Sequence, residues 1–410
     1  MRILCVTEDL PWPSTSGYRV RLSNILPALT ALATVDHWVA LKVDRDPELP
    51  DQEPGSDVAR VRVVPNRYPR PQLARVARWG TGSMPRDILQ RDWKRARADF
   101  EQWVEPPYDL VWYGHLETLL GVGGIVDAPA ILDLDNLWDH ALGFRRQAFR
   151  AWRPDAHLLR QLRGVAASVA DAVDARKYRS LHHTVARQVG AVLVSSELDL
   201  RRLGVDNAVV VPNAYPAPTP PAGLRDPDLA SPCLVMTGSL RYMPNADAAR
   251  WFVHEVLPAL RAALPGVRLR LIGSHGGVLD DLATVAGVEL VGSVDDIGAE
   301  LRRADAAIVP IRFGGGTRVK ILEAFAYRLP VVSTAVGCEG IGAVSGTHLL
   351  VADSAESFAA ACVRAVRDPG LRSSLTGAAW DLYRSRYEPA VVRATITDVV
   401  KQVVSAAAGG

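Results

Sequence analysis

The 410-residue sequence lacks several features that would assign it to a specialised class of protein. Its four cysteines are scattered without C-x-x-C spacing, which excludes a local dithiol or zinc motif, and three of them lie in apolar runs typical of buried free thiols. They are Cys5, Cys233, Cys338 and Cys362. No stretch approaches the roughly 18 uncharged apolar residues that cross a bilayer, and acidic residues at positions 8 and 9 cut the apolar N-terminus too short for a signal peptide. We therefore expect a cytoplasmic protein.

Strong net charge and internal repeats are also absent. The formal net charge of +2 provides no global argument for binding nucleic acid. Hydrophobic residues make up 48% of the chain and charged residues 22%, which excludes wholesale disorder. A chain of this length usually divides into two domains, because a single hydrophobic core stops growing at a smaller size.

Short apolar runs alternate with helical stretches in both halves of the sequence, as in parallel sheets joined by crossover helices. In the first half, strands are expected at residues 2–7, 39–43, 61–64, 110–113, 131–134 and 191–194, and a helix across 141–187. In the second half, strands are expected at residues 233–236, 268–272, 288–291, 306–309, 331–332 and 348–351, with helices at 246–263 and 318–327. A segment rich in Pro, Ala and Gly, residues 212–232, separates the halves.

These patterns predict an α/β protein of two doubly wound, Rossmann-like domains that face each other across a cleft. We expect an N-terminal domain over residues 1–212 and a C-terminal domain over 213–386. The tail, 387–410, has apolar residues at helical spacing and is expected to cross back to the first domain. Ligands of such sheets bind beyond the carboxyl ends of the strands, so the loops that follow the strands are the candidates for a site.

A glycine-rich loop, Gly314 to Gly316, follows one predicted strand of the second half. The glycines allow close approach of the backbone to a ligand, and Thr317 is a suitable N-cap for a helix opening at Arg318. Free amide groups and the helix dipole favour an anion such as a diphosphate, whereas Arg318 and Lys320 are unfavourable there unless an anion lies nearby. A flexible turn with solvated charges is the alternative.

Glu323 lies in the same predicted helix among apolar neighbours. Its carboxylate could accept hydrogen bonds from two vicinal hydroxyls, such as those of a ribose. An intrahelical pair with Lys320, three residues earlier, is the alternative, and the local spacing does not decide between the two.

Together with other motifs, these residues resemble the retaining GT-B glycosyltransferases of the GT4 type. The resemblance rests on the ordered set Val211-Pro-Asn213, Thr237-Gly-Ser239, Leu271-Ile-Gly273, Asp305-Ala-Ala-Ile-Val-Pro310, Ile321-Leu-Glu-Ala-Phe-Ala326 and Pro330-Val-Val-Ser-Thr334, with the glycine-rich loop. The first strand and the Pro-rich loop leading to Ser16-Gly17 are similar to the opening of the same family. The resemblance spans nearly the whole chain and is strongest over residues 211–334.

The resemblance implies a role for each matching residue. It implies that Glu323 binds the nucleotide ribose, that the nucleotide base docks near Val294, and that Gly17 approaches the diphosphate from the other domain. The diphosphate and sugar would be met by Ser239, Arg241, Gly315, Gly316, Thr317 and Arg318. Cations and amide groups at these positions would stabilise the charge of a diphosphate leaving group.

The sequence departs from the family pattern at three places. Gly315 stands where the family often has a first glutamate, near the donor sugar, which puts sugar recognition in question. Ser16-Gly17 replaces the family's Gly-Gly pair. The lysine that commonly follows the basic residue Arg241 is missing, with Met243 or Asn245 in that area, and Lys320 is the predicted substitute.

On the other domain, His115 follows a predicted strand and matches a position where related enzymes place a polar residue near the sugar; a structural role is its alternative. The run Asp133-Leu-Asp135-Asn136 has the D-x-D form of metal-dependent transferases of another fold. We interpret Asp135 and Asn136 as acceptor contacts or as a cap of the following helix, and expect no metal. Basic stretches at 70–97 and 145–163 fit an anionic acceptor, an anionic membrane surface at the inner membrane face, or solvated helix faces.

The expected activity is transfer of a hexosyl-type group from a nucleoside diphosphate sugar to an acceptor hydroxyl, with retention of anomeric configuration. His115, Arg241 and Lys320 are the expected catalytic residues, and the nucleotide sugar is a substrate, so no cofactor is expected. The alternatives are a sugar-nucleotide epimerase, a pseudo-glycosyltransferase, or a non-catalytic binding partner on the same fold. The base, the sugar, the acceptor and the oligomeric state are not readable from the sequence.

Overall fold

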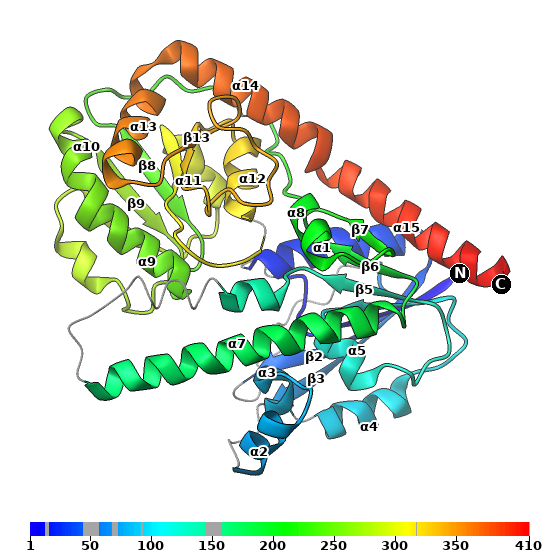
Figure 1. Ribbon diagram of the computed structural model, residues 1–410. Coiled ribbons are helices and arrows are strands. Elements are labelled where there is room, and N and C mark those ends of the chain that lie inside the picture. Colours follow the sequence, from blue (N-terminus) through cyan, green and yellow to red (C-terminus); the bar gives the residue numbers. More distant parts are fainter. Residues whose placement is uncertain are drawn as a thin grey trace. The chain divides into compact units, whose positions relative to one another are not determined.

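The computed structural model describes residues 1–12, 16–43, 57–67, 73–91, 93–143, 158–220, 222–316 and 318–409 (Figure 1). The chain forms two compact units: the first runs from the N-terminus to Pro212 and resumes at Val392, and the second is Asn213–Val391, with which Gly17 groups. The first boundary falls at the expected position. The second lies at Val392 instead of residue 387.

The first unit is built on a seven-stranded, wholly parallel sheet with the order β3-β2-β1-β4-β5-β6-β7. Its strands are β1 (Arg2–Thr7), β2 (Thr34–Val43), β3 (Arg60–Arg67), β4 (Leu110–Gly114), β5 (Ala130–Leu134), β6 (Ala191–Val194) and β7 (Ala208–Val210). Helices connect them: α1 (Gly17–Thr30), α2 (Leu73–Thr81), α3 (Arg86–Gln90), α4 (Trp93–Trp103), α5 (Leu116–Val122), α7 (Leu158–Ala186) and α8 (Glu197–Leu203). The central strands are buried along their length because helices cover both faces, which explains why they read as continuous apolar runs.

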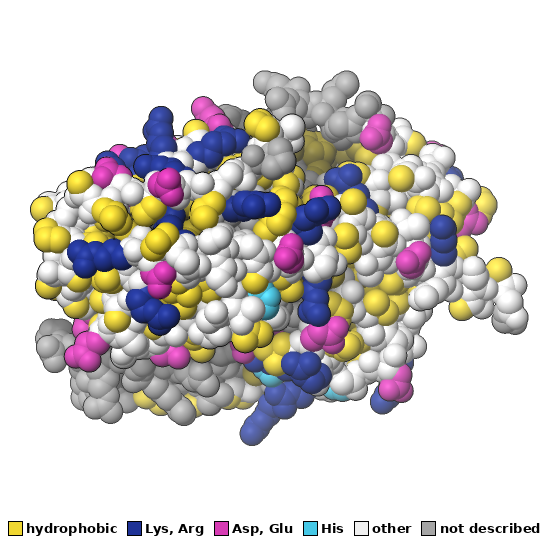
Figure 2. Space-filling model, turned by 90° about the horizontal axis from the view of Figure 1, so that it is seen from above, with side chains coloured by type: hydrophobic (Ala, Val, Ile, Leu, Met, Phe, Trp, Pro, Cys, Tyr) yellow, Lys and Arg dark blue, Asp and Glu magenta, His cyan; other side chains and the backbone are white. Residues whose placement is uncertain are grey.

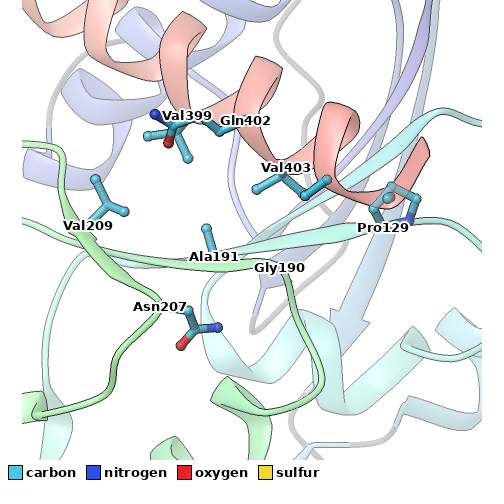
Figure 3. A pocket seen from close by; sticks show the side chains of 10 residues that line it. Pro129, Gly190, Ala191, Asn207, Val209, Val399, Gln402 and Val403 are labelled. Atoms are coloured by element: carbon cyan, nitrogen blue, oxygen red, sulfur yellow. The ribbon is translucent and has the colours of Figure 1, made fainter. Parts of the chain in front are cut away.

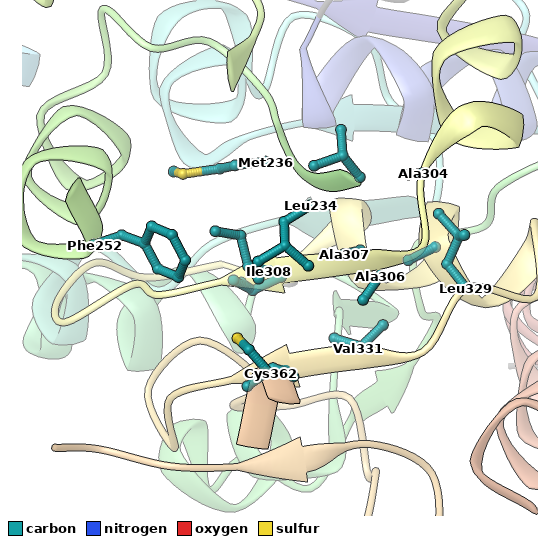
Figure 4. Packing of buried hydrophobic residues seen from close by; sticks show 14 of the residues in the cluster. Leu234, Met236, Phe252, Ala304, Ala306, Ala307, Ile308, Leu329, Val331 and Cys362 are labelled. Carbon is teal, nitrogen blue, oxygen red and sulfur yellow. The ribbon is translucent and has the colours of Figure 1, made fainter. Parts of the chain in front are cut away.

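The second unit repeats the plan with six parallel strands in the order β10-β9-β8-β11-β12-β13. They are β8 (Cys233–Thr237), β9 (Arg268–Ile272), β10 (Val288–Gly292), β11 (Ala306–Val309), β12 (Val331–Ser333) and β13 (Leu350–Val351). The helices are α9 (Met243–Trp251), α10 (Leu257–Ala263), α11 (Ile297–Arg303), α12 (Val319–Ala326), α13 (Ala355–Arg367) and α14 (Pro369–Arg386). Figure 4 shows side chains of β8 and β11, among them Leu234 and Ile308, packed with Phe252 and Cys362 in the core of this unit.

The final helix, α15 (Pro389–Gly409), belongs to the first unit from Val392 onward, as predicted. The apolar residues at helical spacing are its buried face. A Cβ on Gly190, just before β6, would lie 2.7 Å from Cγ1 of Val403, so the helix is in close contact with the start of β6. Beside this contact, Val399 and Val403 line a cavity of about 470 Å³ together with Ala191 and Val209 (Figure 3).

The structure corrects several predicted elements. The short edge strand β7 was not expected, and the helix predicted over 246–263 is divided by a π-helical turn, Phe252–Val256. Strand β13 is shorter than predicted, and α12 begins at Val319 instead of Arg318. Of the helix predicted over 141–187, residues 141–143 are helical, residues 144–157 lie outside the described residues, and α7 covers Leu158–Ala186.

The four cysteines are free thiols, three of them buried. Among the helices of the described residues, none has the length and apolar character needed to cross a membrane. Figure 2 shows basic and acidic side chains interspersed over the face that it presents, in keeping with the small net charge.

Candidate functional site

In the second unit, the strand order reverses direction between β8 and β11, which are neighbours in the sheet although β9 and β10 separate them in sequence. In doubly wound sheets this switch point opens a crevice at the carboxyl ends of the strands, where ligands bind. The loop after β8 begins at Gly238, and the loop after β11 contains the glycine-rich segment. The predicted donor residues of these two loops therefore lie at the place that the topology favours.

The glycine-rich loop is held in shape by Arg318. The guanidinium donates hydrogen bonds from Nη1 to the carbonyl of Gly315 at 2.6 Å and from Nη2 to that of Gly314 at 2.7 Å. Gly314 and Gly316 have φ angles of 120° and 81°, which favour glycine. Arg318 is buried, its Nε has no hydrogen-bond partner among the described residues, and burial lowers its pKa. Arg318 therefore supports the loop backbone and adds positive charge beneath it.

Arg318 is also the N-cap residue of α12, and its side chain makes no capping hydrogen bond. This corrects the expected cap: Thr317 lies outside the described residues, and the helix starts one residue later than predicted. The first turn contains no acidic residue. Its amide groups, the helix dipole and two basic side chains thus combine into a region of positive potential suited to an anion.

Lys320 lies in that first turn, and its ammonium points to the loop after β8. Nζ donates a hydrogen bond of 2.8 Å to Oδ1 of Asn245, and a Cβ placed on Gly238 would be 3.2 Å from Nζ. Burial, followed by repulsion from Arg318, lowers the pKa of Lys320 to about 7, against a smaller opposing effect of Glu323. This ammonium has lost much of its hydration, so an anion would bind it strongly.

Glu323 is hydrogen-bonded by hydroxyl groups, not by the lysine one turn before it. The Thr237 hydroxyl donates to Oε2 at 2.8 Å, and the Tyr215 hydroxyl makes a second hydrogen bond to the carboxylate. Burial raises the pKa of Glu323, while these hydrogen bonds and the charge of Lys320 act in the opposite direction. Glu323 therefore does not form the hydrogen-bonded intrahelical pair with Lys320 that was the alternative. Its carboxylate accepts hydrogen bonds from two hydroxyl groups, as expected of a residue that contacts a ribose.

The remaining predicted donor residues lie on separate elements. Ser239 and Arg241 are exposed in the loop after β8, and the Arg241 amide donates to Ser274 of the next loop at 3.0 Å. Val294 is half-buried after β10, at the outer edge of the sheet. Gly17 begins α1. Arg241 is thus exposed, whereas Lys320 is half-buried.

In the first unit, the switch point lies between β1 and β4, and His115 follows β4 directly. Its φ of 78° and ψ of 153° belong to a region occupied almost only by glycine, so the backbone is strained there. The ring stacks on Tyr18 with centroids 3.8 Å apart. Burial, assisted by Lys42, lowers the pKa of His115 to about 4, so the imidazole is neutral at physiological pH. Strain of this kind is typical of functional sites.

A buried network of charges surrounds His115, and sequence reasoning missed it. Glu8, directly after β1, is contacted by Nζ of Lys42 at 2.5 Å, by Arg91 and by Nδ1 of His115 at 3.4 Å. Glu117 lies 4.0 Å from Arg91. Burial raises the pKa of Glu117, but Lys42, His115 and Arg91 outweigh this effect and lower it. The position of Glu8 directly after a predicted strand could have marked it as a candidate site residue. Lys42 and Arg91 come from distant elements, and no sequence pattern links them to Glu8.

Asp133, the first acid of the D-x-D run, is a structural residue. It is fully buried and accepts hydrogen bonds from Nε of Arg21 at 2.9 and 3.0 Å and from Nη2 at 2.5 Å, while Arg21 Nη1 donates to the carbonyl of Val211. Its carboxylate is therefore engaged by an arginine and unavailable to a metal. Asp135 and Asn136 are half-buried after β5, at the same strand ends as His115.

In the first basic stretch, Lys94, Arg95 and Arg97 are exposed, as expected of solvated helix faces, whereas two arginines bind buried acids. Arg86 binds the buried Asp171 and Asp174 of α7 at 2.6 and 2.5 Å, and Arg91 belongs to the network of Glu8. Arg78 of α2 is exposed, as expected. The side chains of the second stretch, 145–163, lie outside the described residues.

The fold is that of the GT-B glycosyltransferases. Sucrose-phosphate synthase of Thermosynechococcus elongatus superposes with a TM-score of 0.67 at 16% identity over 99% of this chain and all of that one. HepE of Anabaena, in complex with UDP and glucose, has a TM-score of 0.59 at 15% identity, covering 98% and 99% of the two chains. WaaG, a glycosyltransferase involved in lipopolysaccharide biosynthesis, has a TM-score of 0.59 at 12% identity, covering 97% and 99%.

Residues 231–368, about a third of the chain, match the family described as glycosyl transferases group 1. A curated relative, an uncharacterized 44.6 kDa protein in the cps region of Klebsiella pneumoniae, is 25% identical over 141 residues. That match spans 32% of this chain and 36% of the relative. The predicted fold class is confirmed, and the family match over residues 231–368 agrees with the predicted resemblance.

Proposed function

We propose that this protein transfers a hexosyl-type group from a nucleoside diphosphate sugar to an acceptor hydroxyl, with retention of anomeric configuration. The observation that carries the proposal is the switch point of the second unit, where a glycine-rich loop, the buried Arg318, the half-buried Lys320 and a hydroxyl-binding carboxylate meet. The HepE structure contains UDP and glucose on the same fold. These observations support a nucleotide sugar as donor.

In this proposal the donor diphosphate binds the N-terminus of α12 and the loop after β8. Lys320 and Arg241 stabilise the negative charge that develops on the leaving diphosphate, and Arg318 keeps the loop amides in place. When the donor binds, the carboxylate of Glu323 gives up its hydrogen bonds from Thr237 and Tyr215 and accepts hydrogen bonds from the ribose hydroxyls. Since the family supplies no enzymic nucleophile, the departing phosphate deprotonates the acceptor on the same face of the sugar.

The acceptor is proposed to bind the first unit at the strand ends around His115. The neutral imidazole can donate or accept a hydrogen bond without adding charge, so it suits a sugar hydroxyl. Asp135 and Asn136 are proposed as further acceptor contacts. Gly315, in place of the family's first glutamate, favours one competing activity, a pseudo-glycosyltransferase whose donor-derived group is not an ordinary sugar.

The test is a thermal-shift screen with UDP, GDP, ADP and dTDP on the wild type and on Glu323→Gln. A nucleotide at 100 times its Kd stabilises the native state by about 2.7 kcal/mol. We expect one nucleotide to raise Tm in the wild type and to lose most of that effect in Glu323→Gln. Glu300→Gln is the matched control, since Glu300 is a half-buried helix glutamate of the same unit that binds Arg270 at 2.5 Å.

Absence of a shift with all four nucleotides would refute the donor site. Retention is tested separately, by NMR of the product anomer formed from the identified donor. An inverted product would overturn front-face displacement, and turnover of the nucleotide sugar without an acceptor would favour an epimerase.

A further inference from the structure

Asn245 connects the two loops that form the proposed donor site. It lies in the first turn of α9, is 8% exposed, and uses both ends of its amide. Oδ1 accepts from Nζ of Lys320 at 2.8 Å, and Nδ2 donates to the carbonyl of Ser239 at 2.8 Å. The side chain therefore joins the loop after β8 to the first turn of α12, across 75 positions in the sequence.

The space around the ammonium of Lys320 is restricted. Gly238 has a φ of 115°, and a Cβ there would lie 3.2 Å from Nζ and 3.4 Å from Nδ2 of Asn245. Among the described residues, two charged groups face the ammonium, Arg318 and Glu323, while the loop after β8 and α9 contribute the neutral Gly238 and Asn245. Asn245 is thus the uncharged group that fixes where the ammonium points.

We propose that Asn245 is a positioning residue that holds Lys320 against the diphosphate of the donor without neutralising its charge. This inference rests on the proposed function. An amide oxygen accepts a hydrogen bond from an ammonium but has no net charge, whereas a carboxylate at the same place would form an ion pair and cancel it. With an asparagine, Lys320 and Arg318 both remain available as positive charges beneath the loop.

This arrangement selects for a ligand with at least two negative charges near α12. A nucleoside diphosphate satisfies it, and a nucleoside or neutral sugar does not. The deprotonated lysine would lose the attraction, so the affinity for a diphosphate falls as the pH rises through the titration of Lys320, whose pKa burial and Arg318 lower to about 7. Bound phosphate itself favours the ammonium and moves the loss of affinity to higher pH.

The experiment measures Kd for UDP between pH 5.5 and 9 by calorimetry on the wild type, Asn245→Ala and Asn245→Asp. At pH 6.5 we expect both variants to bind about tenfold more weakly or worse, because one loses the orientation of the ammonium and the other its charge. In Asn245→Asp the alkaline loss of affinity should also move upward by a pH unit or more, because a carboxylate stabilises the ammonium. Asn207→Ala is the control: Asn207 donates to two backbone carbonyls of the first unit at 2.8 and 2.9 Å.

The same proteins without ligand provide a second readout, the NMR titration of the Lys320 side chain. Asn245→Asp should raise the pKa of Lys320, and Lys320→Met identifies the signal. Asn245 variants that keep the wild-type Kd and pH profile, or a Lys320 titration indifferent to Asn245→Asp, would overturn the inference. Failure of the wild type to bind any nucleotide would instead refute the proposed function, and the ligand-free titration would still test the contact.

Discussion

The buried pair of Arg21 and Asp133 leads to a prediction that separates structure from chemistry at the D-x-D run. We consider Arg21→Met, Asp133→Leu and the double variant. Each single change removes the hydrogen-bonded partner of a charge inside the first unit, where Arg21 is 2% and Asp133 0% exposed. Removing one partner of a buried pair costs about 3–5 kcal/mol, whereas replacing both by apolar groups of similar size is often neutral.

The expected magnitudes follow from the contacts. For a unit of roughly 200 residues, 1 kcal/mol shifts Tm by about 2–4 °C, so each single variant should lose about 6–20 °C. The double variant also leaves the carbonyl of Val211 without the hydrogen bond from Arg21, at a cost of about 0.5–1.5 kcal/mol. We therefore expect its free energy of unfolding to lie within about 2 kcal/mol of the wild type, and the two sites to be strongly coupled.

Calorimetry with and without UDP is the assay, since the nucleotide should stabilise the second unit and so identify the transition of the first. Glycosyl transfer by the double variant is measured beside it. If the pair of Arg21 and Asp133 has only a structural role, the double variant should recover both its stability and its turnover. Single variants with the wild-type Tm but no turnover, or a double variant as unstable as the singles, would refute the reasoning and assign Asp133 to the chemistry.

Three further predictions concern individual residues of the two sites. Gly238→Ala should destabilise the second unit by about 1–3 kcal/mol, because of its φ of 115° and the nearby ammonium of Lys320, and a wild-type Tm would contradict this. His115→Gly should cost little stability, since relief of about 1–3 kcal/mol of backbone strain offsets the lost stacking on Tyr18, yet turnover should fall at least tenfold; a collapse of Tm instead would show a structural role. UDP affinity should decrease as the pH falls through the raised pKa of Glu323, because the protonated carboxyl accepts fewer hydrogen bonds, and Glu323→Gln should abolish that acid limb.

Much of the fold could be predicted from local sequence patterns. The buried strands were predictable because parallel strands covered on both faces need apolar side chains throughout, and the glycine-rich loop was recognisable because its backbone requires φ angles that other residues disfavour. The last helix was identified by its spacing, since one face had to be buried. Strand β7 was missed because it has three residues at the sheet edge and all are half-buried.

The sequence by itself determined the class of fold, the position of the candidate donor site and the residue types present there, because these depend on periodicity and on short ordered motifs. Only the tertiary structure decided which of those residues interact. Lys320 binds Asn245 and not Glu323, Asp133 binds Arg21 across 112 positions, and the network of Glu8 draws on several separate elements. A charged side chain interacts with the groups that lie near it in the folded chain. The spacing of residues in the sequence does not give those distances.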